Sequence, residues 1–114
     1  MQGDMMGTDS SGHRIDDQEL LELINEFVAS LDERMHDLEA ALEAEDWALV
    51  EAVSHRLAGT ADLYHMDDLS SISARIEELA RVQPGSQGLV QKVADLRTTV
   101  HGISGHQLIQ DPRE

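Results

Sequence analysis

The chain has 114 residues and no cysteine, and its 23 acidic and 8 basic residues give a formal net charge of −15. This length suits one domain with a single core, and the lack of cysteine excludes disulfides and thiolate metal sites. The charge weighs against nucleic acid and anionic membranes as ligands, because both require Lys and Arg. No apolar stretch reaches the roughly 18–20 residues of a membrane-spanning helix. Residues 1–14 lack the apolar core of a signal peptide, so we expect a cytoplasmic protein.

Apolar residues recur every three to four positions from residue 20 to residue 103, which predicts helices and no strands. Asp16 or Asp17 is the expected N-cap of the first helix. Its apolar stripe is long enough for one helix of about 28 residues, or for two helices joined by a bend near Ala29-Ser30. The stripe consists of Leu20, Ile24, Phe27, Leu31, Met35, Leu38 and Leu42.

Three further helices are predicted along the chain. Asp46 is the expected N-cap of the second, the pair Asp67-Asp68 begins the third, and Gln83-Pro84-Gly85-Ser86 forms the loop before the fourth. Their apolar faces consist of Trp47, Val50, Val53, Leu57, Ala61 and Tyr64, then Leu69, Ile72, Ile76 and Leu79, and finally Leu89, Val93, Leu96, Val100 and Ile103.

Short connections between long amphipathic helices make neighbouring helices antiparallel. The predicted fold is therefore all-α, an antiparallel up-down-up-down four-helix bundle that leaves room for a short extra helix at the N-terminus. We expect the bundle over residues 15–106, a flexible N-terminal tail over residues 1–14 and a C-terminal tail over residues 107–114. Gly102 and Gly105 weaken the end of the last helix.

One histidine lies in the middle of the second predicted helix, on its solvent side. At about 100° per residue, His55 is about 160° from the centre of the apolar face, and Ala52, Gly59 and Asp62 lie on the same stripe. A helical glycine costs roughly 0.5–1 kcal/mol relative to alanine, and packing of the protein's own helices does not explain one on an exposed face. A tolerated surface glycine is the alternative. Together, the small residues indicate that a partner approaches His55 closely.

The chemistry of an exposed imidazole suits phosphoryl transfer. A neutral ring has a nucleophilic nitrogen that needs no separate base, and the protein then supplies mainly position and electrostatics. Arg56 could help to neutralise the phosphoryl charge, although it lies about 100° from His55 around the helix. Leu49 and Leu63 are candidate apolar docking residues near the edge of the stripe, with partial burial against the bundle as the alternative.

The run His55-Arg56-Leu57-Ala58-Gly59-Thr60-Ala61 resembles the motif of the histidine-containing phosphotransfer (HPt) domain family, which is approximately His-x-Leu-Lys-Gly-Ser followed by a later glycine and leucine. Leu69 matches that leucine, and the resemblance covers roughly residues 15–103. It implies a bundle without an ATP site, in which His55 accepts a phosphoryl group from a receiver-domain aspartate and passes it to another receiver. The implied partners are response-regulator receiver domains and a hybrid sensor kinase. Gly59 would admit the receiver's loops, and magnesium would belong to the receiver, so that this chain needs no cofactor.

Two positions depart from the family pattern. Ala58 replaces the lysine and so removes a positive charge near the phosphohistidine, while His65 replaces the later glycine. Arg56 or a basic residue of the partner could compensate for Ala58. The alternative function is therefore a non-catalytic bundle that binds a kinase or receiver domain and regulates it without phosphoryl transfer.

Other kinds of site have weaker support in the sequence. No His-Glu-x-x-His or similar ligand motif occurs, so no metal site is predicted. The run Gly85-Ser86-Gln87-Gly88 lacks the lysine of a phosphate-binding loop and does not follow a strand, so it does not indicate nucleotide binding.

Overall fold

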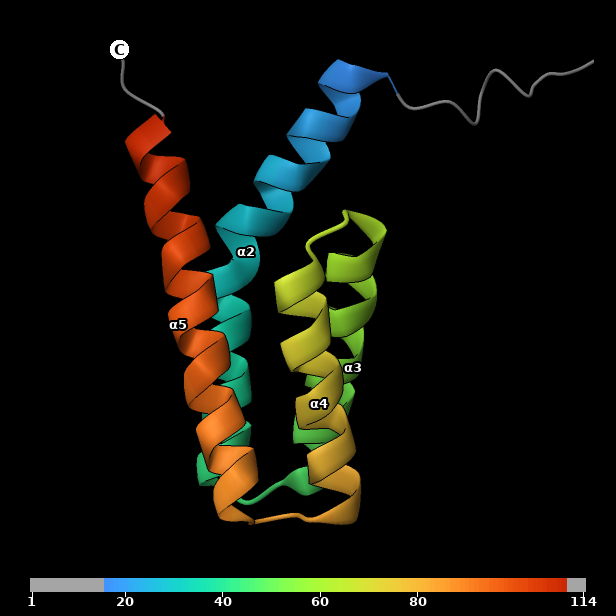
Figure 1. Cartoon of the computed structure of the whole chain (residues 1–114), viewed down its shortest axis with the longest axis vertical. Coiled ribbons are helices and arrows are strands. Elements are labelled where there is room, and N and C mark those ends of the chain that lie inside the picture. The colour runs from blue at the N-terminus through green and yellow to red at the C-terminus, as the bar shows by residue number, and fades with distance from the viewer. Residues whose placement is uncertain (1–15, 111–114) are drawn as a thin grey trace, which may run out of the picture.

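The computed structural model describes residues 16–110, and the side chains of residues 16–104. This part of the chain contains four helices and no strand: α2 (Asp17–Glu43), α3 (Trp47–Leu63), α4 (Asp67–Val82) and α5 (Gln87–Gln110). Each helix contacts two others, in the cyclic order α2, α3, α4, α5, and Figure 1 shows the antiparallel arrangement. The predicted all-α four-helix bundle is confirmed. The expected N-terminal tail and extra helix lie outside the described residues.

Side-chain caps fix three of the helix beginnings. Asp16, Asp46 and Ser86 each accept a hydrogen bond from the backbone N–H three residues further on, at 2.7, 3.2 and 3.1 Å, and so begin α2, α3 and α5. α4 has no side-chain cap, but the pair Asp67-Asp68 lies in its first turn, where the helix dipole favours negative charge. These boundaries agree with the sequence prediction because capping is a local property of the chain.

α2 is one continuous helix, and its N-terminal part leans away from the rest of the bundle (Figure 1). In the middle of α2, the Ser30 hydroxyl donates to the Phe27 carbonyl at 2.7 Å and accepts from Arg34 Nε at 2.8 Å. A serine hydroxyl bonded to the carbonyl of the preceding turn commonly bends a helix. Of the two alternatives predicted for this segment, the single helix is the one observed, and this hydrogen bonding offers a local reason for its change of direction.

The core is aliphatic and runs along the axis of the bundle. It is formed by Phe27, Leu31, Met35, Leu38, Val50, Leu57, Ala61, Leu69, Ile76, Leu79, Leu89, Val93, Leu96 and Val100, with smaller contributions from Ala41 and Ala80. Leu20 was expected on the same stripe but is 39% exposed, and Ile24 is only half-buried. The stripe of α2 thus continues beyond the turn between α3 and α4, onto the part of the helix that leans away from the bundle (Figure 1).

α5 extends to Gln110, so residues 107–110 of the expected C-terminal tail are helical. A glycine within a helix costs only about 1 kcal/mol relative to alanine, which is too little to end a helix at Gly102 or Gly105. Residues 111–114 lie outside the described part. Among the described helices, none combines the length and the apolar character that crossing a membrane requires.

α3 and α4 approach each other through small side chains. Ser54 of α3 and Ser73 of α4 are fully buried, and by helical register each lies on the side that faces the other helix. The Ser70 hydroxyl donates to the Ala58 carbonyl across this interface at 3.1 Å. The Ser54 hydroxyl is bonded to carbonyls of its own helix, whereas Ser73 Oγ has no partner within the described residues. This close approach brings the polar side chains of α4 within reach of His55.

Candidate functional site

The residues of the predicted stripe all lie on the solvent side of α3. Ala52, His55, Gly59 and Asp62 are exposed, and the side chain of His55 is 72% exposed. A Cβ added at Gly59 would meet no atom within 4 Å, so internal packing does not require a glycine there. The structure therefore has an open, low-relief surface around one imidazole, as the helix register predicted.

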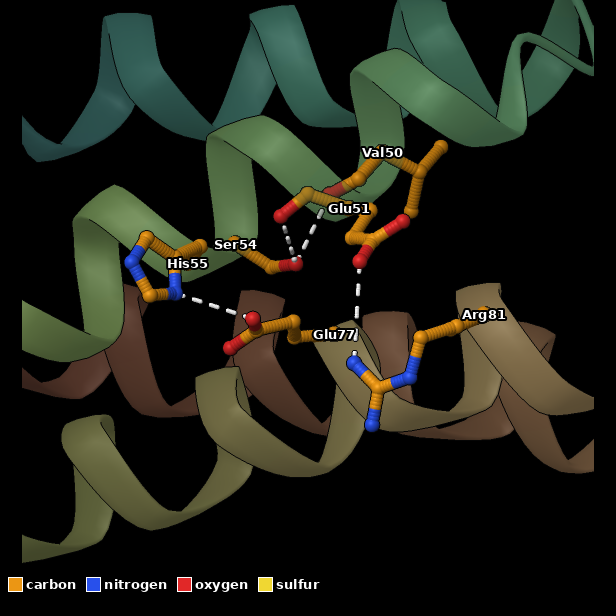
Figure 2. Close-up of polar contacts among 6 residues, drawn as sticks. All are labelled: Val50, Glu51, Ser54, His55, Glu77 and Arg81. Atoms are coloured by element: carbon orange, nitrogen blue, oxygen red, sulfur yellow. Dashed lines mark hydrogen bonds and ion pairs between the residues drawn. The ribbon is translucent and has the colours of Figure 1, made fainter.

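Sequence reasoning missed the residue that contacts this imidazole. Glu77 of α4 places its Oε2 2.9 Å from Nδ1 of His55 (Figure 2). Its side chain is 22% exposed, so it is considerably more enclosed than the histidine it contacts. Glu77 lies 22 positions after His55, in no motif with it, and only the packing of α3 against α4 brings the two together. No sequence signal could have identified it.

This contact determines which nitrogen of His55 can react. A carboxylate only accepts hydrogen bonds, so the Nδ1 atom that faces Glu77 carries the hydrogen and donates it. Nε2 of the neutral ring then keeps its lone pair, and Figure 2 shows this second nitrogen pointing away from Glu77. The pair thus orients the ring, presents Nε2 as a nucleophile, and places a negative charge where an imidazolium would form.

The charges around His55 are mostly negative. An open depression of about 460 Å³ beside it is lined by Ala48, Glu51, Ala52, His55, Arg56 and Glu77. Arg56 is the basic residue of this lining. Arg81 of α4 lies 3.6 Å from Glu51 in an ion pair one turn away (Figure 2). An incoming phosphoryl group would therefore meet two carboxylates and one guanidinium belonging to this chain.

A second depression, of about 390 Å³, lies between α2 and α3, and its surface is mostly apolar. It is lined by Asp37, Ala40, Ala41, Ala44, Asp46, Leu49, Val53 and Arg56. Arg56 borders both depressions and connects the polar site to this apolar groove. Leu49 is 43% exposed in the groove, whereas Leu63 is 68% exposed at the far end of α3 and borders neither depression. The structure therefore brings Leu49 near the site and leaves Leu63 apart from it.

The remaining predicted residues are placed differently from His55. Ala58 is half-buried, and its carbonyl accepts the hydrogen bond from Ser70 of α4. Ala58 is not among the residues that line the depression beside His55. Gly59 and Asp62 continue the stripe towards the end of α3. His65 follows that end with a φ of 59°, in the left-handed region. A glycine adopts this conformation without strain, which is a physical reason for a glycine at the position.

Comparison with known protein families matches residues 22–106 to the family model described as Hpt domain. The matched segment begins within α2, includes all of α3 and α4 and most of α5, and contains both His55 and Glu77. No curated protein and no solved structure matches the chain.

Proposed function

Since the chain belongs to the Hpt domain family, we propose that His55 carries a phosphoryl group between receiver-domain aspartates in a two-component phosphorelay. The observation that best supports this role is the hydrogen bond between Nδ1 of His55 and Glu77, formed on an otherwise open helix surface. It leaves Nε2 as an oriented nucleophile that an aspartyl phosphate can approach.

The proposed transfer consists of one substitution at phosphorus. Nε2 attacks the phosphorus of the receiver's aspartyl phosphate, the P–O bond to the aspartate breaks, and the aspartate carboxylate leaves with the electron pair. The new N–P bond gives a phosphoimidazolium, whose positive charge lies next to Glu77. In the second transfer, a carboxylate of another receiver attacks phosphorus, and the electron pair of the N–P bond returns to Nε2. No proton has to leave the ring in either direction.

In the proposed transfer, this chain and the receiver each supply part of the positioning and part of the positive charge. Such transfers depend on position and on neutralising the phosphoryl oxygens. Arg56 can contribute one positive charge, and the receiver, with its magnesium ion, supplies the others. The small residues Ala52 and Gly59 leave room for receiver loops, and the groove beside Leu49 suits an apolar side chain of the receiver. Asp62 would then lie at the edge of the contact.

The experiment that tests this function is phosphoryl transfer from phosphorylated receivers of the same organism. We expect an acid-labile phosphoryl group on His55, mapped by mass spectrometry, and its loss in His55→Gln. His101→Gln is the matched control, because His101 is also an exposed helical histidine. If no histidine is labelled while receivers still bind, the protein is instead a non-catalytic module that regulates a kinase or receiver by docking.

A further inference from the structure

The first turns of α2 form a separate apolar surface away from His55. We call residues 16–26 the α2 arm. Leu20, Leu21 and Leu23 are 39, 53 and 37% exposed, and Ile24 is the one half-buried residue of the arm. Figure 1 shows the arm rising above the turn between α3 and α4, where no other described helix covers it. An exposed apolar patch of this kind usually marks an interaction site.

The arm borders two adjoining hollows. One, of about 270 Å³, is lined by Glu19, Glu22, Leu23 and Glu26. The other, of about 290 Å³, shares Leu23 and Glu26 and reaches α3 at Tyr64. The ring of Tyr64 lies 5.7 Å from that of Phe27, so the second hollow has an aromatic wall. Together the hollows make a groove with apolar walls and an acidic rim.

The charge of the groove is mainly negative, although Arg34 also lines the second hollow, with its guanidinium 5.3 Å from the centre of the Phe27 ring. The arm carries five carboxylates and no basic residue: Asp16, Asp17, Glu19, Glu22 and Glu26. The helix dipole accounts for acidic residues in the first turn, but Glu22 and Glu26 lie beyond it. Within the described residues, neither of these two glutamates forms an ion pair, although Glu22 accepts a hydrogen bond from Gln18. Among the described residues, Glu22 and Glu26 are therefore available to pair with a cationic ligand.

From this combination, we propose that the α2 arm is a docking surface for an amphipathic helix of a partner protein. The apolar side chains of that helix would lie along Leu20, Leu23 and Ile24, with its Lys or Arg residues beside Glu22 and Glu26. A second copy of this chain would bring the same five carboxylates to the contact and be repelled. The chain's own residues 1–15 contain two aspartates and a single arginine, so they do not complement the rim.

The position of the groove leaves the phosphotransfer site open. Tyr64 lies nine residues after His55, which places the two on opposite sides of α3. A helix bound along the arm would leave the His55 surface free for a second contact. If that helix belongs to a protein carrying a receiver domain, docking would raise the effective concentration of the receiver near His55. The docking surface itself does not depend on the proposed phosphotransfer.

A synthetic helical peptide of Leu and Lys, with Leu at i, i+3, i+4 and i+7, tests the proposal on the full chain. NMR would follow the amide shifts, and we expect the changes to be concentrated on the arm and around Tyr64. Calorimetry would give the affinity of each variant for the peptide. Leu20→Ser/Leu23→Ser should weaken binding about tenfold or more, because both side chains would be buried by the peptide. Glu22→Gln/Glu26→Gln should also weaken binding, and more so at low salt. This second pair provides an independent test if the serine variant is unstable.

Two matched variants separate the arm from the general acidity of the protein. Val82→Ser/Val90→Ser removes comparably exposed apolar groups elsewhere, and Glu33→Gln/Glu43→Gln removes two exposed charges from the rest of α2. Equal weakening by these controls, or equal binding of a peptide with scrambled Leu positions, would overturn the proposal. So would dimerisation through the arm in sedimentation. In the Leu20→Ser/Leu23→Ser variant without peptide, changed amide shifts in residues 1–15 would show that the chain itself covers the arm. That result would also overturn the proposal.

Discussion

At the scale of single residues, the proposed chemistry depends on two atoms, Nδ1 of His55 and Oε2 of Glu77. The histidine is largely exposed and could rotate freely, but the hydrogen bond that it donates to a more enclosed carboxylate holds one ring orientation. Glu77 does not reach the phosphoryl group through this contact. It acts through the imidazole, and we therefore regard it as a positioning residue.

The Glu77→Gln variant tests the negative charge of Glu77, because glutamine has nearly the same shape but is neutral. The amide oxygen can still accept from Nδ1, but it provides no negative charge for the phosphoimidazolium. We expect the transfer rate at saturating receiver to fall about tenfold, equivalent to the ~1.5 kcal/mol of a charged hydrogen bond, while receiver affinity stays the same. Single-turnover kinetics measures this. Glu78→Gln, an exposed neighbour that pairs with Arg75, is the control, and equal rates in wild type and Glu77→Gln would refute the role.

His65 gives a second prediction at this scale, concerning stability. Its φ of 59° is costly for a residue with a Cβ and easy for glycine. At the end of α3, the backbone N–H of His65 donates a hydrogen bond to the Asp62 carbonyl at 3.0 Å, and a glycine would keep this bond. We expect His65→Gly to raise the free energy of unfolding by about 0.5–1 kcal/mol, measured by urea denaturation. A lower stability would mean that the imidazole makes a favourable contact that outweighs the strain.

The sequence predicted His55 but not Glu77, and the reason is physical. The register of a single helix suffices to place His55, Gly59 and Asp62 on a face opposite the apolar arc. Glu77 belongs to the site only because α3 and α4 pack at one particular rotation and offset, which no property of either helix alone determines. The placement of Leu49, but not Leu63, beside the His55 surface likewise depends on where α2 lies.

At the scale of helices, the site depends on the interface between α3 and α4. Ser54 and Ser73 are fully buried there, and larger side chains would hold the two backbones further apart. Their hydroxyl groups differ: Ser54 is bonded to carbonyls of its own helix, but Ser73 Oγ has no partner in the described part of the chain. The interface therefore depends on the small size of Ser73 and not on its hydroxyl group.

Two substitutions of Ser73 should have opposite effects. Ser73→Ala removes a buried hydroxyl that has no partner among the described residues, so we expect unchanged stability or a gain of up to about 1 kcal/mol. Ser73→Leu overfills the interface, with a loss of about 1–3 kcal/mol, and moves Glu77 away from His55. Thermal unfolding measures the stabilities, and the ring nitrogen shifts of His55 report the contact. A destabilised alanine variant would show that the hydroxyl has a partner after all.

Local signals predicted the elements well where local forces decide them. Asp16 and Asp46 accept hydrogen bonds from backbone N–H groups at helix beginnings, and the Ser30 hydroxyl donates to the carbonyl of its own preceding turn in α2. The end of α5 was placed too early, because two glycines weaken a helix without ending it. The exposure of Leu20 was missed because it depends on where the turn between α3 and α4 lies and on the direction in which the N-terminal part of α2 leans (Figure 1).

At the scale of the whole molecule, an ion pair joins the first and last described helices. Arg97 of α5 donates two hydrogen bonds to the carboxylate of Glu39 on α2, one of them from Nε at 3.0 Å. The hydrogen bond from Arg97 lowers the pKa of Glu39 below its ordinary value of 4.5 and raises that of Arg97. Both side chains are about one-third exposed, so solvent weakens the contribution.

Glu39→Gln should therefore lower stability by about 0.5–1 kcal/mol at pH 7. Because the folded-state pKa of Glu39 is depressed, its contribution is present above the unfolded pKa and is lost as pH falls through the lower folded value. The difference between wild type and variant should shrink as the pH drops below about 4.5. Urea denaturation across this range measures it, with Glu33→Gln as an exposed control on the same helix. A difference that is constant with pH would contradict this account.

The overall architecture was predictable because short connections leave antiparallel neighbours as the arrangement of four amphipathic helices. That the net charge of −15 disfavours nucleic acid and anionic membranes as partners stays a prediction. The α2 arm was not predictable, since its stripe has the same periodicity as the buried part of α2. The exposure of the arm follows from where α3 ends and α4 begins, because the turn between them leaves the first apolar residues of α2 uncovered.

The most direct test of the central claim is to identify the phosphorylated atom. The full-length protein would be treated with phosphoramidate, which phosphorylates histidine without a receiver, and its imidazole nitrogens followed by ¹⁵N NMR. The account predicts a phosphoryl group on Nε2 of His55, with Nδ1 still protonated and bonded to Glu77. Phosphorylation at Nδ1 of His55, or at another histidine in preference to it, would contradict the account.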